Sequence, residues 1–298
     1  MLCLHVAASA WDVTRSSVAR FPASALHTSR VRVAVAFGTE AEHHEHLAAH
    51  AALPEGFRVG VSGFDFTPQE ADMRAVMNLT LIVLDRPSSC FAGVFTRNAF
   101  CGAPVTVGRR RLAESEAVQA VVVNNKISNV CAAGDGVGTS EQLCAEVASA
   151  LGIEGGAAAV IPASTGVIGW ALPLPSMVDA LPATVKALQR ESAMGAASSI
   201  MTTDRFPKLR AASACGGRIV GIAKGAGMIE PNMATMLSFV LTDIAVPRPA
   251  LQQMLSRITD ESFNCISVDA DQSTSDTLLC LSSEAHPLPA SRVGIERC

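Results

Sequence analysis

The chain has 298 residues, which is long enough for one large domain or two medium ones with a sizeable core. Hydrophobic residues make up 49% of it, a fraction that fits a globular protein and excludes a disordered chain. The formal net charge of −4 gives no electrostatic reason to expect a nucleic-acid partner, and no run of about 18 apolar residues predicts a membrane span.

The cysteines, nine in all, are spread singly along the chain without a C-x-x-C pair. An odd, unclustered set differs from a secreted disulfide framework and from a zinc site. Most of these thiols are therefore expected to be small buried side chains in a reducing compartment.

Residues 1–40 differ in composition from the rest of the chain. Up to Gly38 they are rich in serine and alanine and hold several arginines but one acidic residue, Asp12. This composition is typical of an organelle transit peptide and predicts import into the mitochondrial matrix, with a plastid as the second choice. A disordered extension without a targeting role is the alternative. The arginines are Arg15, Arg20, Arg30 and Arg32.

The segment from Glu40 to Pro54 is polar and contains the histidine-rich run AEHHEHLAAH. His46 and His50 are four residues apart and would share one face of a helix. No cysteine or carboxylate partner lies at metal-ligand spacing, and the H-E-x-x-H motif is absent. A solvated segment before the domain is therefore favoured over a metal site, and no metal is expected.

Three strands are predicted next, over residues 76–85, 91–96 and 119–125, each of them an apolar run. The glycines of CAAGDGVGTSEQ then precede a helix, with Thr139 as the expected N-cap and Gln142 three residues further on. A G-x-G-x-G turn before a helix can cradle a phosphate. No Walker lysine follows it, and the entrance to a helix needs glycines anyway, so the structural interpretation is favoured.

The second half of the chain mixes strands and helices in the same way. This mixture predicts an α/β or α+β layered domain, and no internal repeat is found. The expected strands cover residues 157–163, 218–225 and 236–246, and the expected helices cover residues 176–196 and 247–263, the second with a proline at its start.

The stretch KGAGMIEPNMATMLSFVLTD, residues 224–243, joins a glycine-rich turn directly to a buried strand. A threonine hydroxyl at this junction is a weak nucleophile until a base takes its proton. The threonine's own α-amine, with a pKa of about 7.7 to 8.0, would serve as that base once the chain is cut between Ala234 and Thr235. The hydroxyl of Thr235 could make the cut by attacking the carbonyl of Ala234. The plain alternative is a β-branched residue that begins a strand.

The same stretch resembles the self-processing motif of the ornithine acetyltransferase family, also called glutamate N-acetyltransferase, of arginine biosynthesis. Other segments are similar to further motifs of that family and occur in family order, so that the similarity covers roughly residues 54–277. These segments are GVFTRN (93–98), PASTGVIG (162–169), IMTTD (200–204) and VDADQSTSD (268–276).

For catalysis, the resemblance implies that Thr235 becomes the N-terminal nucleophile of a β chain, with Ala234 as the new end of the α chain. It also implies that Thr165 and Gly166 form an oxyanion hole. Acyl transfer builds an oxyanion, and preorganised donors stabilise it by about 3 kcal/mol each. Read without the family, STGVIG is a tight turn after a strand.

For substrate binding, the resemblance implies Thr202 and Lys224, in addition to Thr235. The cation of Lys224 can pair with the α-carboxylate of a substrate, although a lysine at a strand end is usually solvated. VDADQSTSD carries Asp269 and Asp271 but lacks the glycine and the closing glutamate of an EF-hand loop. It is therefore interpreted as structural support near the site and not as a metal loop.

For the fold, the resemblance implies a layered α-β-β-α sandwich of the ornithine acetyltransferase type, similar to N-terminal-nucleophile enzymes. The expected divisions are a transit-like extension (1–40), the α chain (41–234) and a partial β chain (235–298), with α and β chains pairing into a heterotetramer. The implied reaction is ping-pong: N-acetylornithine acetylates Thr235, ornithine leaves, and glutamate takes the acetyl group. No cofactor is implied, although some members also use acetyl-CoA as the donor.

Two positions depart from the family pattern, since Ala270 and Ser275 stand where the family more often has glycine and asparagine. Family β chains also continue well beyond the position of Cys298, so the sequence is expected to be a C-terminally truncated member. Two other functions stay open. A related self-cleaving aminopeptidase or amidase would pass the acyl group to water, and an inactive remnant would only fold or bind a partner subunit. STGVIG and MTTD together favour the transferase.

Overall fold

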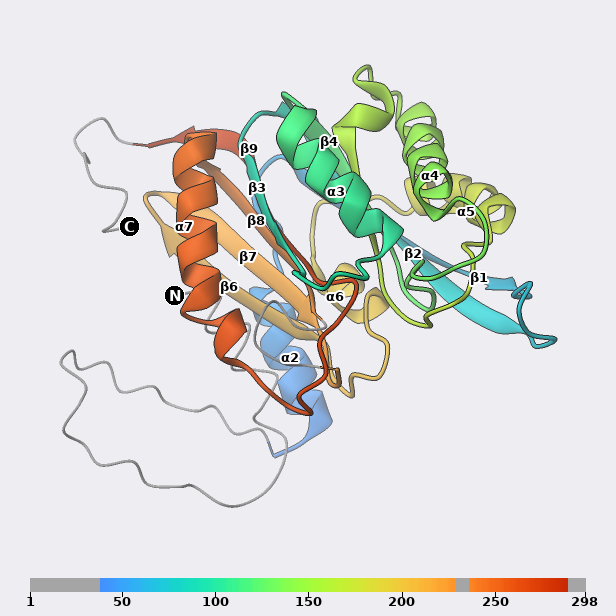
Figure 1. The fold of residues 1–298 in the computed structure, drawn as a ribbon. Coiled ribbons are helices and arrows are strands. Elements are labelled where there is room, and N and C mark those ends of the chain that lie inside the picture. Colours follow the sequence, from blue (N-terminus) through green and yellow to red (C-terminus); the bar gives the residue numbers. More distant parts are fainter. Residues whose placement is uncertain (1–37, 229–235, 289–298) are drawn as a thin grey trace.

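The structure is a computed structural model of the chain and describes residues 38–228 and 236–288 (Figure 1). The helices are α2 (Glu40–His50), α3 (Ala103–Glu114), α4 (Gly136–Leu151), α5 (Leu174–Lys186), α6 (Met194–Ser199) and α7 (Arg248–Asp260), with short 3-10 turns η1 (Gly156–Ala159) and η2 (Phe263–Cys265). The strands are β1 (Phe57–Phe66), β2 (Ala75–Ser88), β3 (Phe91–Phe95), β4 (Val118–Asn124), β5 (Val160–Ser164), β6 (Lys208–Ala214), β7 (Gly217–Lys224), β8 (Leu237–Ala245) and β9 (Thr277–Pro287).

These strands form two sheets, with the orders β1-β2-β4-β5 and β3-β9-β8-β7-β6. The pairs β4–β5 and β8–β9 are parallel, and the other neighbours are antiparallel. β7 and β8 are adjacent, and Lys224 at the end of β7 pairs with Leu237 at the start of β8. The described residues on either side of 229–235 therefore lie close together at one end of the five-stranded sheet.

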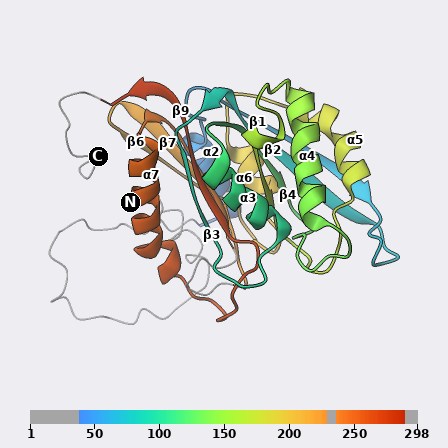
Figure 2. The same cartoon turned by 45° about the horizontal axis from the view of Figure 1, so that its top comes forward.

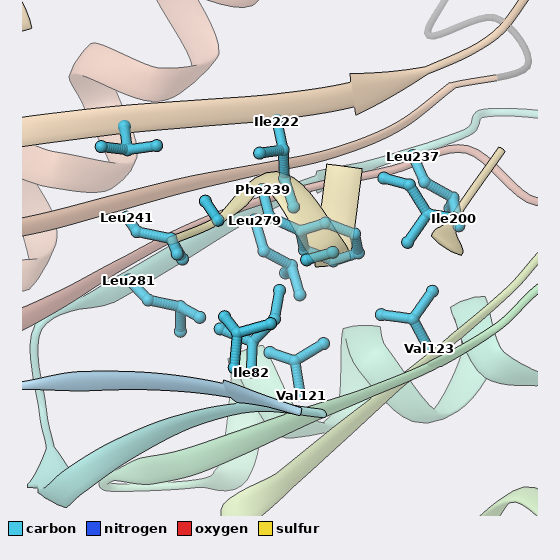
Figure 3. Close-up of a cluster of buried hydrophobic side chains, with 14 of the residues drawn as sticks. Ile82, Val121, Val123, Ile200, Ile222, Leu237, Phe239, Leu241, Leu279 and Leu281 are labelled. Atoms are coloured by element: carbon cyan, nitrogen blue, oxygen red, sulfur yellow. The ribbon is translucent and has the colours of Figure 1, made fainter. Parts of the chain in front are cut away.

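The core lies between the two sheets. Successive side chains of a strand face opposite sides, so alternate residues of each central strand point into this space. Ile82, Val121 and Val123 extend from the four-stranded sheet toward Phe239 and Leu279 of the five-stranded sheet (Figure 3). All five are at most 1% exposed. Each side chain buried to this degree contributes about 1.5–3 kcal/mol to folding.

Helices cover the outer faces of both sheets. α4 and α5 pack on the four-stranded sheet, and α7 packs on the five-stranded sheet (Figures 1 and 2). The alanines of α6 pack instead in the cluster between the sheets. Because both faces of the central strands are covered, their sequences read as continuous apolar runs. The layered α-β-β-α sandwich expected from the resemblance is confirmed.

The prediction of a single helix over residues 176–196 is wrong. α5 ends at Lys186, and α6 begins at Met194. Between them, Gln189 exchanges two backbone hydrogen bonds with Val59 of β1, with N···O distances of 2.9 and 3.0 Å. Pairing with the edge of the sheet thus interrupts a pattern whose apolar spacing continues along the sequence.

The expected N-cap of α4 is also wrong, because the helix begins before Thr139. The carboxylate of Asp135 accepts from the N–H of Gly138 at 2.8 Å, and the hydroxyl of Thr139 donates to the carbonyl of Asp135. The glycines therefore belong to the first turn, where an aspartate already satisfies one free N–H group. Similarly, β5 begins at Val160, since the preceding alanines form η1.

Several elements had no sequence prediction, namely α3, β1, β6 and β9. The polar segment before the domain was expected to be solvated, but part of it packs on the domain. It forms α2, whose Leu47 is buried and whose start carries a capping box between Thr39 and Glu42. Arg218 of β7 donates to the carbonyls of His50 and Ala52, so the helix is tied to the five-stranded sheet.

The cysteine expectation holds for some of the described thiols and not for others. Cys90, Cys144 and Cys280 are buried, whereas Cys131 and Cys265 are exposed. Cys215 forms a disulfide. Among the helices of the described ranges, none is long and apolar enough to cross a bilayer.

Candidate active site

The centre of the candidate site is Lys224, the last residue of β7. Its side chain is buried, with a relative exposure of 3%. The ammonium Nζ donates to the hydroxyl of Thr202 at 3.3 Å, and Thr202 is exposed in the turn after α6. The structure therefore brings together the two residues expected to bind substrate, at a point where a buried cation meets the surface.

The surroundings of Lys224 disfavour the charged form of its side chain. Burial lowers the pKa of Lys224 from 10.5 to about 8, although the carboxylates of Asp204 and Asp276 act in the opposite direction. Within the described part of the chain, no carboxylate oxygen lies within 4.0 Å of its Nζ atom. A buried cation without an ion-pair partner is costly, and a ligand carboxylate would relieve that cost.

A second lysine of the same region is fully paired. Lys208 of β6 forms a buried ion pair with Asp204, and the same carboxylate accepts from the backbone N–H of Gly225 at 2.7 Å. Burial by itself raises the pKa of Asp204, but Lys208, the Gly225 N–H and Lys224 together bring the pKa below its ordinary value. Asp204 therefore fixes the backbone immediately after Lys224.

Asp276, the residue before β9, is completely buried. Its Oδ1 atom accepts from the N–H of Met236 at 2.6 Å. Its Oδ2 atom has no hydrogen-bond partner in the described ranges. Burial raises the pKa of Asp276 well above its ordinary value, despite the opposing effects of Met236, Ser273 and Lys224. The carboxyl group thus favours its neutral form and keeps one oxygen uncommitted.

The STGVIG segment leaves β5 beside the loop that follows β4. Gly166 has φ of +132°, and a Cβ atom there would lie 2.1 Å from the carbonyl carbon of Lys126. Only glycine fits such a position. Among the described residues, neither the N–H of Gly166 nor the hydroxyl of the buried Thr165 donates a hydrogen bond. The turn therefore holds two donors that are uncommitted among the described residues, and an oxyanion hole needs such donors.

Two asparagines connect this turn with the substrate-binding residues. The side chain of Asn125 donates to the carbonyl of Met201 at 3.1 Å and accepts from the N–H of Asn78 at 2.7 Å. Asn125 precedes Lys126, whose carbonyl accepts from the N–H of Val167. A continuous set of contacts thus runs from STGVIG to the MTTD turn.

Ala234 and Thr235, the expected cleavage site and nucleophile, lie outside the described residues. The structure places Lys224 and Met236 on the two sides of this segment. It also adds residues that the sequence interpretation missed, namely Asn78, Asn125, Asp204, Lys208 and Asp276. A useful signal was present for Asp276, because it is a carboxylate that ends a family-like motif directly before an apolar strand.

Other sites receive little support. Within residues 38–228 and 236–288, no group of three His, Cys, Asp or Glu side chains could hold a metal ion. A hollow of about 450 Å³ lies at the C-terminal end of α4, lined by small residues such as Ala145 and Ala148. None of the expected site residues lines that hollow.

Comparison with known sequences gives consistent matches. Residues 66–296 match the sequence model of the ArgJ family. An arginine biosynthesis bifunctional protein ArgJ of Nitratidesulfovibrio vulgaris is 42% identical over 239 residues, which are 79% of this chain and 59% of the relative. The corresponding protein of Methylococcus capsulatus is 43% identical over 221 residues, which are 73% of this chain and 53% of that relative. The chain thus spans between half and three-fifths of the length of these curated relatives.

Solved structures also resemble the chain. The arginine biosynthesis bifunctional protein ArgJ of Bacillus halodurans shares 25% identity with a TM-score of 0.45, over 63% of this chain and 94% of that chain. An ornithine acetyltransferase of Mycobacterium tuberculosis, complexed with ornithine, shares 26% with a TM-score of 0.49, over 63% and 97%. An L-aminopeptidase D-Ala-esterase/amidase of Ochrobactrum anthropi, a variant of the Ntn hydrolase fold, shares 10% with a TM-score of 0.47, over 78% and 75%.

Proposed function

Because the chain belongs to the ArgJ family, we propose that it is an acyltransferase of arginine biosynthesis that moves an acetyl group from N-acetylornithine to glutamate. The observation that carries this proposal is the state of Lys224. It is a buried cation that touches the hydroxyl of Thr202 and lacks a carboxylate partner among the described residues. Both proposed substrates carry an α-carboxylate that would complete this pair.

The nucleophile would be made by cleavage of the chain. The hydroxyl oxygen of Thr235 attacks the carbonyl carbon of Ala234, the C–N bond breaks, and the amine of Thr235 takes the proton. Water then hydrolyses the resulting ester, which leaves Ala234 with a carboxylate and Thr235 with a free hydroxyl and a free α-amine. An amine of this kind titrates near neutral pH and suits the role of general base.

Acetyl transfer would follow in two halves. The hydroxyl of Thr235 attacks the acetyl carbonyl of N-acetylornithine, its α-amine takes the hydroxyl proton, and that proton passes to the departing amine of ornithine. The amine of glutamate then attacks the acetyl ester and restores the hydroxyl. In both halves the developing oxyanion would accept from the hydroxyl of Thr165 and from the N–H of Gly166, neither of which donates to another described residue.

Cleavage would not separate the two pieces. β8 begins after the junction, and it lies between β7, from before the junction, and β9 in the same sheet. β9 in turn pairs with β3. The backbone ladders on both sides of the β fragment would therefore hold it against the α fragment, and we propose that two such pairs form a heterotetramer.

Cofactor use and location are part of the same proposal. No cofactor is needed, because Thr235 itself carries the acetyl group, and acetyl-CoA would act only as an additional donor. Residues 1–40, of which 1–37 lie outside the described ranges, would direct import into the mitochondrial matrix. A fusion of residues 1–40 to a fluorescent reporter would then enter mitochondria, and a cytosolic signal would contradict the location.

The activity is tested with N-acetylornithine labelled in its acetyl group. The proposal predicts label in N-acetylglutamate when glutamate is present and little free acetate. Acetate as the main product, together with hydrolysis of amino-acid amides, would instead assign the chain to the aminopeptidase or amidase alternative. An absence of any labelled product from a folded chain would identify it as an inactive remnant.

A further inference from the structure

One short segment contacts the chain on both sides of the expected cleavage junction. The carboxylate of Asp269 accepts from the N–H of Met228 at 2.5 Å. The carboxyl group of Asp276 accepts from the N–H of Met236 at 2.6 Å, and the N–H of Thr277 donates to the carbonyl of Met236 at 3.0 Å. Two acidic side chains that are seven positions apart thus bind the last described N–H before residues 229–235 and the first one after them.

The segment is itself anchored by the loop after β3. The hydroxyl of the buried Thr96 donates to the carbonyl of Ser273 at 2.7 Å, and its N–H donates to the carbonyl of Asp276 at 3.0 Å. The side chain of Asn98 and the N–H of Gly102 donate to the next carbonyls along the segment, those of Gln272 and Thr274. These contacts give a structural role to the GVFTRN motif, for which the sequence suggested none.

Asp276 is an unfavourable residue to bury for stability alone. Its Oδ2 atom lacks a partner among the described residues, and its burial favours the neutral acid. A side chain with one unsatisfied oxygen would be replaced by an apolar one without loss if it only filled space. Its other oxygen, however, fixes the backbone of Met236, the residue that follows Thr235 in the sequence.

We propose that residues 269–276 form a clamp in which Asp269 and Asp276 position the two chain segments flanking the cleavage junction, with Thr96 as its anchor. This inference rests on the proposed self-processing. Attack of a hydroxyl on the preceding carbonyl requires alignment within a fraction of an ångström, and misplacement by 1 Å can cost about a hundredfold in rate. Asp269 and Asp276 are therefore positioning residues, which act through the backbone and not on the reacting atoms.

The test compares the rate of self-cleavage of the whole chain among paired variants. Asp269→Ala is expected to slow cleavage by roughly ten- to a hundredfold. Its control is Asp271→Ala, which should leave cleavage unchanged. Asp271 is an exposed aspartate of the same segment that contacts Asp269 through its backbone N–H, which the substitution keeps. Asp276→Ala should slow cleavage strongly, whereas Asp276→Asn should restore most of the rate, because its amide oxygen still accepts from Met236. The cleavage rate of Thr96→Val should lie between the rates of Asp276→Ala and Asp276→Asn.

Thermal unfolding of each variant shows whether a slower cleavage comes from lost positioning or from a destabilised fold. If Asp276 acted only through its charge, Asp276→Asn would not restore the cleavage rate. Equal cleavage rates for Asp269→Ala, Asp271→Ala and the unaltered chain would overturn the clamp, even if Asp276→Ala fails to fold.

A second measurement keeps the clamp distinct from the proposed function. In a Thr235→Ala background, amide hydrogen exchange is followed in peptides that contain Met228 or Met236. The clamp predicts that Asp269→Ala raises exchange at Met228 alone and that Asp276→Ala raises exchange at Met236 alone. If these amides exchange as fast before the substitutions as after, the clamp is wrong. If the amides are protected but the unaltered chain is never cleaved, the contacts are real and the proposed self-processing is wrong.

Discussion

Asp204 and Lys208 lie within the same site as Lys224 and Asp276, and all four side chains are buried. The first two form a closed ion pair that also binds a backbone N–H. The second two stay apart: the ammonium of Lys224 contacts only a hydroxyl among the described residues, and one oxygen of Asp276 has no partner there. The pKa of Lys224 is lowered and that of Asp276 is raised, and both shifts favour the neutral form of the group. The pKa of Asp204 is lowered, which favours its charged form.

The difference separates two uses of buried charge. A buried ion pair whose groups are all hydrogen-bonded fixes the local geometry and needs no further partner. Buried ionisable groups without a partner lower the stability of the fold, and they are retained where a ligand or a reaction needs them. We therefore propose that Lys208 belongs to the scaffold and that Lys224 binds the substrate. If this is so, substitutions at the closed pair should change stability, and substitutions at Lys224 should change substrate binding.

Removing the charge of Asp204 should give the largest loss of stability. Asp204→Asn leaves the ammonium of Lys208 buried without a counter-charge, which is expected to lower the free energy of unfolding by about 3–5 kcal/mol. The contribution of Asp204 should also be lost as the pH falls below its ordinary pKa of 3.8, because its folded pKa is lower still. Denaturant unfolding measures both effects. Asp271→Asn is the exposed control, and a loss no greater than in that control would show that the pair is not structural.

Thr165→Ala should affect the transition state more than the fold. If the hydroxyl of Thr165 donates to the oxyanion, its loss should lower kcat by about a hundred- to a thousandfold. KM should change much less, since the charge exists only in the transition state. Steady-state kinetics on cleaved protein measures the division between the two constants. Near-normal turnover would return STGVIG to the role of a structural turn.

Lys224→Met should separate binding from stability. Loss of the ammonium removes a charged hydrogen bond to the substrate carboxylate, and KM should rise roughly ten- to a hundredfold. The free energy of unfolding should stay the same or rise by up to about 3 kcal/mol, because the pKa of Lys224 falls from 10.5 to about 8 on burial. Lys186→Met, at the exposed end of α5, is the matched control and should change neither quantity much. A large loss of stability with unchanged KM would assign Lys224 to the scaffold.

The pH dependence of KM and of stability should reflect the titration of Lys224. Substrate binding needs the ammonium, so KM should rise by about tenfold for each pH unit above pH 8. Between pH 8 and 10.5 the unfolded chain binds more protons at this position than the folded chain, so the contribution of Lys224 to stability should increase with pH. Both trends should disappear in Lys224→Met, and their persistence there would point to another group.

The smallest effect is expected at Ser275, whose buried hydroxyl has no partner among the described residues. Ser275→Ala removes an unsatisfied polar atom and should leave the free energy of unfolding unchanged or raise it by about 1 kcal/mol. Thermal or denaturant unfolding decides this. A clear loss of stability would show that the hydroxyl is satisfied in solution.

The apolar runs of the sequence predict most central strands and a layered domain, because alternate residues of these strands must fill two apolar spaces. The α-β-β-α sandwich was implied by the family resemblance. It fails where tertiary contacts decide, as at Gln189, whose pairing with Val59 interrupts a helical pattern. It also fails at α2, where a polar composition suggested a solvated segment but Leu47 is buried.

For the site, the motifs identified Thr202 and Lys224, which the structure brings into contact. They could not show that Lys224 is buried without an ion-pair partner among the described residues, because its burial depends on β6 and β8 on either side of β7. The departures at Ala270 and Ser275 acquire a physical meaning only in the structure. Ala270 has φ of +62°, a conformation that glycine adopts without strain, and the hydroxyl of Ser275 is unsatisfied.

The central claim is that Thr235 becomes an N-terminal nucleophile that carries the acetyl group. Intact-mass spectrometry of the purified chain, before and after incubation with N-acetylornithine, tests it directly. The account predicts a fragment that begins Thr-Met-Leu-Ser, gains the mass of one acetyl group with N-acetylornithine, and loses it when glutamate is added. A chain that stays uncut, or a fragment beginning at Thr235 that gains no acetyl group, would contradict the account.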